Sequence, residues 1–268
     1  MKIGFIGLGN MATAIIGGLL REDTALSSED GNATVITAAN IIGSAKTEAT
    51  RQKRAEQFGI AVTASNREVA EAADVLVLAV KPQFFPEVIA EIRDAVSENT
   101  LVISIAAGLT LERIAGLFDR NVAAMRLIRC MPNTPALVNA GCTAVVPGPG
   151  ATEADEALCL RLMESFGRAI VIPERLMDAA SATAGSSPAF MFIEALADGA
   201  VAAGMPRTQA YEFAAAAVAG SAQLVLETGR HPGDLKDMVC SPGGTTIEGV
   251  RALEEGAFRA SVMNAISA

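Results

Sequence analysis

Several residue types are scarce in this chain of 268 residues, and their scarcity excludes whole classes of protein. Trp is absent, Tyr and His occur once each, and none of the four cysteines is at CxxC spacing from another. With so few ligands a metal site is not expected, and we expect the cysteines to be reduced, mostly buried thiols. No apolar run reaches about 18 residues, so we expect no membrane-spanning helix.

Positive charge is also limited. Lys and Arg number 21 against 30 Asp and Glu, which gives a formal net charge of −9, and no basic run occurs. This balance argues against binding to nucleic acid or to an anionic membrane surface. We therefore expect a cytoplasmic protein that acts on a small molecule, with local positive potential wherever an anion binds.

Apolar residues are plentiful, at 51 % of the chain. In the first two-thirds, short apolar runs alternate with helical patterns such as those over residues 12–20, 48–58 and 85–96. This alternation is typical of a parallel sheet covered by helices on both faces. The fold class we predict is α/β, with an N-terminal Rossmann-like, doubly wound sheet whose strands cover residues 3–6, 34–38, 60–63, 75–80, 101–105 and 122–129.

The remainder of the chain reads differently. Beyond residue 172 the strand runs stop, and alanine-rich helical stretches cover residues 189–203, 207–227 and 247 to the end. Their apolar residues surround most of each helix, which is typical of helices buried in a large core or against another subunit. We predict a dinucleotide-binding domain at 1–172 and an all-helical domain at 173–268 that mediates dimerisation.

The first strand runs into a glycine-rich turn of the form G-x-G-x-x-A. Gly7 permits the tight turn, Gly9 lets the backbone approach a pyrophosphate, and Ala12 allows close packing of the helix on the strand. The helix that follows presents its free N–H groups to the phosphates. A glycine-rich turn without a ligand is the alternative. The predicted cofactor contacts here are Gly7, Leu8, Gly9, Asn10, Met11 and Ala12.

Asn40, near the end of the second predicted strand, is a further predicted cofactor contact, and this position bears on the choice of cofactor. An NAD site usually has Asp or Glu there to bind the ribose 2′-hydroxyl, and none is present. Ser44 and Lys46 follow, with Arg51 and Arg54 beyond, so we predict NADP(H) as the preferred cofactor and NAD(H) as a possible one. A solvated helix face is an equally good interpretation of the two arginines.

Ligands of doubly wound folds bind beyond the carboxyl ends of the strands. Lys81 closes one buried strand, where it could contact the cofactor or be an ordinary surface lysine. Small residues close the next strand and leave room for a nicotinamide ring. The further cofactor contacts predicted at these strand ends are Ala79, Val80, Lys81, Pro82, Ala106, Ala107 and Gly108.

Residues 241–248, SPGGTTIE, suit capture of a carboxylate. Two glycines let successive amides point inward, and Thr245 with Glu248 forms a capping-box pattern, so a helix should begin there with its positive end near the anion. An ordinary Gly-Gly loop before a capped helix is the alternative that these residues alone leave open.

Six stretches together resemble the pyrroline-5-carboxylate reductase family. They are FIGLGNMA at 5–12, AVKPQ at 79–83, SIAAG at 104–108, RCMPNTP at 129–135, LKDMVCSPGGTTI at 235–247 and LEEGAFR at 253–259. The SPGGTT stretch is far more specific than the glycine-rich turn, and the resemblance covers nearly the whole chain.

The resemblance implies reduction of the cyclic imine 1-pyrroline-5-carboxylate to proline by NAD(P)H, the last step of proline synthesis. It implies self-association through the C-terminal helices, as a dimer or a ring of dimers. It adds Asn66 to the cofactor contacts and assigns substrate contacts to Ser241, Gly243, Gly244, Thr245 and Thr246. Thr246, the one catalytic residue we predict, would offer its hydroxyl to the ring nitrogen.

The chain departs from the family pattern at two places. Residues 40–54 look expanded after the second strand, and a family glycine is replaced by Ser187 in AGSSPAF at 184–190. Iminium reduction needs little acid–base machinery, which agrees with a single histidine, His231, that reads as a turn residue.

Two other functions compete with this one. A β-hydroxyacid dehydrogenase would use a lysine on a helix after the Rossmann domain, but Lys236 is the only lysine beyond Lys81. A catalytically silent dinucleotide sensor would bind cofactor without turnover, and it would have no reason to keep the SPGGTT stretch.

Overall fold

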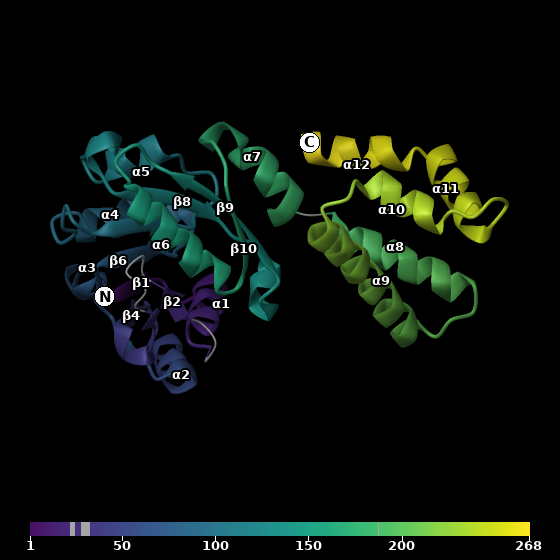
Figure 1. Ribbon diagram of the computed structural model, residues 1–268. Coiled ribbons are helices and arrows are strands. Elements are labelled where there is room, and N and C mark those ends of the chain that lie inside the picture. The colour runs from purple at the N-terminus through teal and green to yellow at the C-terminus, as the bar shows by residue number, and fades with distance from the viewer. Residues whose placement is uncertain (22–24, 28–32, 187) are drawn as a thin grey trace. The chain divides into compact units, whose positions relative to one another are not determined.

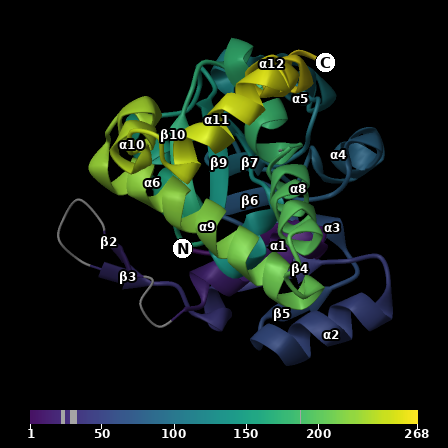
Figure 2. The same cartoon turned by 90° about the vertical axis from the view of Figure 1, so that its right-hand side faces the viewer.

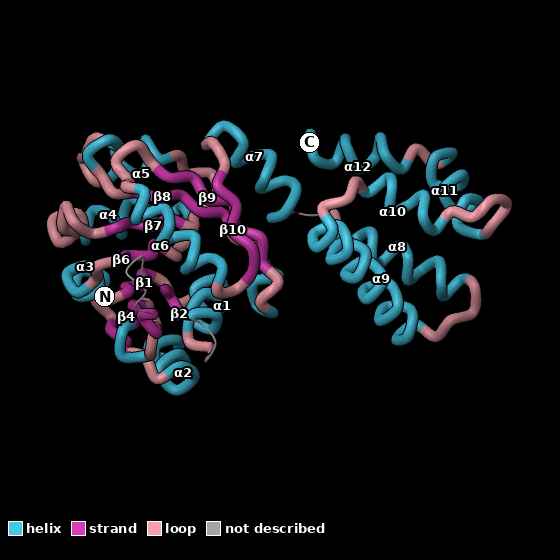
Figure 3. Tube along the Cα trace, viewed as in Figure 1, coloured by secondary structure: helices cyan, strands magenta, loops and turns pink. Residues whose placement is uncertain are grey.

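A computed structural model describes residues 1–21, 25–27, 33–186 and 188–268. It forms two compact units, Met1–Gly185 and Ser186–Ala268, called here the first and second unit. Strands occur in the first unit, whereas the described part of the second contains helices alone (Figures 1 and 3). Ser187 lies outside the described residues.

An eight-stranded sheet organises the first unit, in the order β10-β9-β8-β7-β6-β1-β4-β5. All neighbouring strands are parallel except β8 and β9, which are antiparallel. The Rossmann-like, doubly wound character predicted from the sequence is confirmed. The strand bounds are β1 Ile3–Ile6, β4 Ile41–Ser44, β5 Ala61–Thr63, β6 Val75–Leu78, β7 Leu101–Ser104, β8 Leu127–Met131, β9 Gly141–Pro147 and β10 Gly167–Val171.

Alternate residues of the strands pack on opposite faces of the sheet, as the two-residue period of a strand requires. On one face Phe5 and Val77 pack with α1 and α6, and on the other Ile6 and Leu76 pack with α3, α4 and α5. The helices of this unit are α1 Asn10–Leu19, α2 Glu48–Phe58, α3 Asn66–Ala72, α4 Phe85–Ile92, α5 Leu111–Leu117, α6 Glu153–Glu164 and α7 Met177–Ala180.

The second predicted strand, 34–38, was wrong. The strand that pairs with β1 is β4, with Ile3 opposite Ile41 and Ile6 opposite Ser44. Residues of the predicted strand instead contribute to β3 (Ala33–Val35), which pairs antiparallel with β2 (Ala25–Ser27) in a separate ribbon (Figure 2). Residues 34–38 contain two adjacent β-branched apolar residues, as a strand often does, but pairing with β1 is decided by distant residues.

The second unit consists of five helices among its described residues, and no helix in the described part of the chain is long and apolar enough to cross a membrane. A π-helical turn, Ser181–Gly185, immediately precedes this unit and follows α7. The helices are α8 Ala189–Ala202, α9 Arg207–Thr228, α10 Pro232–Val239, α11 Thr245–Glu255 and α12 Phe258–Ser267.

Candidate active site

The glycine-rich turn has the conformation that its pattern predicts. Gly7 has φ of +96°, which favours glycine, and a Cβ there would lie 2.9 Å from the carbonyl oxygen of Ala79. Gly9 is the N-cap of α1, and a Cβ on Gly9 would meet nothing within 4 Å. The turn therefore leaves open space beside the amino end of α1, where unpaired N–H groups attract an anion.

Two hollows adjoin this turn at the carboxyl edge of the sheet. The larger hollow, of about 490 Å³, joins the ends of β1, β4 and β6, and the smaller, of about 390 Å³, lies between the glycine-rich turn and the start of α2. Eight of the predicted cofactor residues line one or both of these hollows: Gly7, Leu8, Gly9, Asn10, Asn66, Ala79, Val80 and Lys81.

A chain of hydrogen bonds orients Asn66 in the larger hollow. The hydroxyl of Ser44, which is fully buried, donates to Asn66 Oδ1 at 2.7 Å, and Asn66 Nδ2 donates to Glu91 Oε2 at 2.8 Å. Ser44 ends β4 and Asn66 begins α3, so two βα units meet at this point. The sequence did not indicate that Glu91 belongs to the site, because nothing in the local pattern of α4 distinguishes it from other acidic residues of a helix surface.

The two arginines of α2 donate hydrogen bonds to the loops around the smaller hollow. Arg51 Nη1 donates to the carbonyl oxygens of Ala45 at 2.6 Å and Lys46 at 3.1 Å, and its guanidinium also pairs with Glu48. Arg54 Nε donates to the carbonyl of Leu8 at 3.3 Å. Neither side chain is merely a solvated charge on a helix face.

Charge is distributed unevenly between the hollows. Lys46 and Arg54 line the smaller hollow, and no carboxylate is among its lining residues. In the larger hollow Lys46 and Lys81 are balanced by Glu87 and Glu91. In a chain of net charge −9, the smaller hollow is a local region of positive potential.

Asn40 does not lie at this edge. It precedes β4, where its Oδ1 accepts from the backbone N–H of Thr37 at 2.9 Å and its Nδ2 donates to the carbonyl of Met1 at 3.2 Å. Because β4 ends at Ser44, the position after the second strand is Ala45. The expansion that we placed after this strand was also wrong, since three residues join β4 to α2.

The remaining predicted residues of the first unit lie at their expected structural positions without lining these hollows. Ala106, Ala107 and Gly108 follow β7, next to the end of β6, and Gly108 has φ of +74°. Met11 and Ala12 lie in the first turn of α1, with Ala12 buried against the sheet. Pro82 begins a 3₁₀ turn directly after Lys81.

The loop 241–244 turns tightly before α11 in the second unit. Gly243 has φ of +67°, and the N–H of Gly244 donates to the carbonyl of Ser241 at 3.0 Å. The helix begins at Thr245 as predicted, but the capping box was wrong, because Gly244 occupies the cap position without a side-chain bond. Glu248 instead pairs with Arg251.

The first turn of α11 is open to solvent in the isolated chain. Thr245 and Thr246 are its first two residues, and both are exposed. No acid in the loop neutralises the amino end of the helix, so this end can attract a carboxylate. His231, the single histidine, caps α10 by accepting from the N–H of Gly233 at 3.0 Å, which gives it a structural role.

Two family models match the chain. Residues 174–268 match the pyrroline-5-carboxylate reductase dimerisation family, and residues 2–108 match the coenzyme F420-dependent NADP oxidoreductase family. Curated relatives match over almost the whole chain. A pyrroline-5-carboxylate reductase of Escherichia coli (strain K12) is 50 % identical over 99 % of this chain and 94 % of its own. One of Arabidopsis thaliana is 40 % identical, covering 100 % of this chain and 92 % of its own.

The chain belongs to the pyrroline-5-carboxylate reductase family. It is an NAD(P)H-dependent oxidoreductase of that type, as its SPGGTT stretch and glycine-rich turn predicted. Solved structures agree. A pyrroline-5-carboxylate reductase of Coxiella burnetii superposes with a TM-score of 0.89 at 32 % identity, covering 99 % of this chain and 94 % of its own. A pyrroline carboxylate reductase of Plasmodium falciparum with NADP bound has a TM-score of 0.80 at 28 % identity, covering 100 % and 94 %.

Proposed function

We propose that this chain reduces 1-pyrroline-5-carboxylate to proline, with the first unit holding NADPH and the second unit holding the substrate and mediating self-association. The observation that carries this proposal is the pairing, in one chain of this family, of an open glycine-rich turn at the carboxyl edge of a Rossmann-like sheet with an exposed Gly-Gly turn before α11. The division of work follows the two compact units.

The first unit fits a dinucleotide at the observed turn. Open space at Gly9, the left-handed Gly7 and the free amino end of α1 provide for the pyrophosphate. Asn66, held by Ser44 and Glu91, and Lys81 line the space for the adenosine half. When bound, the nicotinamide cofactor supplies the hydride that reduces the imine carbon.

Lys46 and Arg54 would recognise the 2′-phosphate of NADPH. Both line the smaller hollow, and Arg51 holds the loop that carries Lys46 by binding its carbonyl groups. An arginine and a lysine without a competing carboxylate favour a phosphate over a hydroxyl. The bound NADP in the relative from Plasmodium falciparum is consistent with this preference.

The loop 241–244 and the first turn of α11 would bind the substrate carboxylate. The turn at Gly243 and Gly244 brings backbone N–H groups together before the positive end of the helix. Thr246, in the first turn, would orient the ring nitrogen through its hydroxyl. No side chain is required to move a proton during reduction of a protonated imine, so binding and orientation are the work of the chain.

One assay tests the proposal directly. We expect oxidation of NADPH, and more slowly of NADH, with 1-pyrroline-5-carboxylate and not with a 3-hydroxy acid. The 3-hydroxyisobutyrate dehydrogenase of Mycobacterium tuberculosis shares only the fold, with a TM-score of 0.51 at 14 % identity. Oxidation with the hydroxy acid alone would favour a dehydrogenase, and cofactor binding without any turnover would favour a sensor.

Substitutions test the role proposed for each residue of the site. Thr246→Ala should lower kcat while leaving NADPH affinity unchanged, with Thr208→Ala, an exposed threonine in the first turn of α9, as the matched control.

Lys46→Ala and Arg54→Ala should raise KM for NADPH more than KM for NADH. Lys53→Ala changes a cation on the same helix that does not line the hollow. Equal changes for both cofactors would remove the first two from 2′-phosphate recognition.

Self-association follows from the dimerisation family to which residues 174–268 belong. A dimer, or a ring of such dimers, is the assembly we propose, and sedimentation at several concentrations would distinguish the two.

A cytoplasmic site of action is also our proposal. It is supported by four free thiols, since proteins of oxidising compartments usually pair their cysteines.

A further inference from the structure

The chain passes from the first unit to the second through a helical segment that cannot keep its regular hydrogen bonds. The π-helical turn Ser181–Gly185 is followed by Pro188, which has no N–H. In an α-helix the carbonyl of Ala184 would accept from the N–H of residue 188, and a proline removes that donor. A donor from elsewhere in the chain can take its place at this carbonyl.

Asn133 supplies a donor from 51 residues away. Its Nδ2 donates to the carbonyl of Ala184 at 3.2 Å, and its Oδ1 accepts from the N–H of Cys142 at 2.8 Å. The backbone N–H of Cys142 can only donate, which fixes the amide orientation and directs Nδ2 to Ala184. The side chain is 9 % exposed, so solvent competes little for either bond.

The location of Asn133 connects this bond to the cofactor edge. Asn133 follows β8 by two residues, and β8 runs parallel to β7, whose end carries Ala106 to Gly108. Met131, the last residue of β8, also lies beside this segment, because its methyl would be 3.3 Å from a Cβ on Gly185. The end of β8 and the loop after it thus lie next to the last two residues of the first unit.

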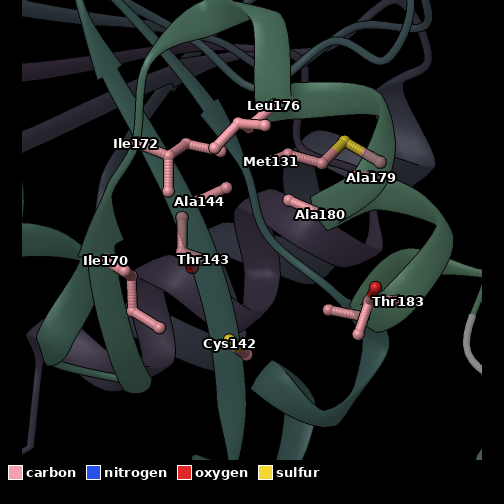
Figure 4. A pocket seen from close by; sticks show the side chains of 11 residues that line it. Met131, Cys142, Thr143, Ala144, Ile170, Ile172, Leu176, Ala179, Ala180 and Thr183 are labelled. Atoms are coloured by element: carbon pink, nitrogen blue, oxygen red, sulfur yellow. The ribbon is translucent and has the colours of Figure 1, made fainter.

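Apolar side chains also surround this segment. Beside it lies an apolar pocket of about 330 Å³, with Met131 and Cys142 from the sheet and Ala180 and Thr183 from the helical segment around it (Figure 4). Apolar contacts around an open pocket define a position less sharply than a directed hydrogen bond. The bond from Asn133 is therefore a specific restraint on where the first unit ends.

We propose that Asn133 is a positioning residue for hydride transfer: by replacing the donor lost at Pro188, it fixes the end of the first unit relative to the cofactor edge. This inference rests on the proposed function, in which the chain beyond Pro188 carries the substrate loop. Asn133 touches neither substrate nor cofactor in this account, so its loss should affect turnover and not cofactor binding.

Two substitutions separate the two bonds of Asn133. Asn133→Asp keeps the acceptor for Cys142 but places an oxygen against the Ala184 carbonyl, whereas Asn133→Ala removes both bonds. We expect both variants to bind NADPH within about twofold of the parent, as fluorescence titration would measure, and to lose about tenfold or more in kcat. Thr100→Val is the matched control, because it removes a buried bond to the carbonyl of Ala73 in the same unit.

A double-mutant cycle tests the link to Pro188. Pro188→Ala restores a backbone N–H, so Asn133→Ala should cost at least threefold less in kcat in that background than in the parent. Parental kcat in Asn133→Asp would overturn the proposal, because the Cys142 bond alone would then be the role of Asn133. An additive cycle, or an equal loss of kcat in Thr100→Val, would overturn it as well.

Hydrogen exchange provides a measurement that does not depend on turnover. In Asn133→Asp the amides of residues 181–186 should exchange at least tenfold faster, while those of β6 and β7 stay unchanged. Parental exchange at 181–186 would overturn the restraint itself. If the parent chain fails to reduce 1-pyrroline-5-carboxylate, the proposed function falls, whereas the exchange result still decides whether Asn133 fixes this segment.

Discussion

The two units of this chain bury their apolar residues in different ways. In the first unit, large side chains such as Phe5, Ile15 and Phe85 are fully buried between a sheet and its helices. In the second unit the buried apolar residues, among those described, are three alanines: Ala197, Ala210 and Ala214. The first unit completes a core within one chain, and the second does not.

Many large apolar side chains of the second unit are exposed in the isolated chain. Phe190 is 67 % exposed, Met191 73 % and Phe213 66 %. Exposed large apolar side chains in such number are typical of an interface. Self-association through the second unit would bury them, which agrees with the dimerisation family that it matches.

The largest effect is expected from blocking the cofactor turn. Gly9→Val places a branched side chain where nothing lies within 4 Å, so the unit should fold normally while NADPH affinity falls roughly 100-fold or more. Fluorescence titration and a thermal melt would measure the two quantities. Gly116→Val, also in open space but on α5, is the control. A lower melting temperature with cofactor binding retained would contradict the assignment of Gly9.

The second prediction concerns the exposed apolar side chains of the second unit. Phe213→Glu puts a charge on exposed apolar surface of α9, so self-association should weaken at least tenfold, while NADPH binding persists because the first unit has its own core. Sedimentation and cofactor titration would measure both. Gln209→Glu adds the same charge on the same helix without removing an apolar side chain. Unaltered association of the phenylalanine variant would place the interface elsewhere.

The third prediction concerns an ion pair that stabilises the first unit. Burial acts to raise the pKa of Asp155, but hydrogen bonds from Arg126 and Thr152 together outweigh it, so the pKa lies below its ordinary value. Asp155→Asn should lower the free energy of unfolding by about 2 kcal/mol at pH 7, as urea denaturation would measure.

The sign of the pH dependence follows from the lowered pKa. The stabilisation is complete above the unfolded pKa of about 4 and is lost as pH falls through the lower folded value. The difference between parent and Asp155→Asn should therefore shrink below about pH 4. Asp119→Asn, in an exposed pair with Arg93, should cost less than about 0.5 kcal/mol. A difference that is constant with pH would exclude the ionised pair as its source.

The smallest effect on binding and stability is expected at the cysteines, where the prediction concerns chemical reactivity. A hydrogen bond with Cys159, at 3.5 Å between the sulfurs, and complete burial raise the pKa of Cys130. Both thiols should resist a disulfide reagent in the native state, while the half-buried Cys142 and Cys240 react roughly 100-fold faster. The variant Cys142→Ser/Cys240→Ser should show no native labelling and full labelling in urea. Rapid native labelling of that variant would mean that the first unit opens readily.

Local sequence signals predicted the helices well and the strands less well. The helix 48–58 has the predicted bounds, since Thr47 caps its start and Gly59, with φ of +67°, ends it. β4 was missed because Ile41–Ser44 is short and contains a glycine. A Cβ on Gly43 would lie 2.6 Å from the Leu8 side chain, so the reason for that glycine lies 35 residues away.

The candidate site likewise contains residues that local sequence signals predicted and residues that they did not. Gly7, Gly9 and the start of α11 were predictable because a turn or a helix end is a property of neighbouring residues. Glu91 was not assigned a place in the site, and for Arg54 a cofactor role and a solvated helix face stayed equally open, because their roles depend on Asn66 and Leu8, which belong to other βα units. The capping box failed for a local reason, since Gly244 could take the cap position first.

The sequence by itself determined the glycine-rich turn, the helical character of the second unit and the family to which the chain belongs, because each is written in adjacent residues or in one periodic pattern. Only the tertiary structure decided which strand lies beside β1, that Arg54 reaches the cofactor turn, and that Asn133 bonds to Ala184. These pairings join residues 38 to 51 positions apart. Their partners are selected by the packing of the whole unit, which no local pattern records.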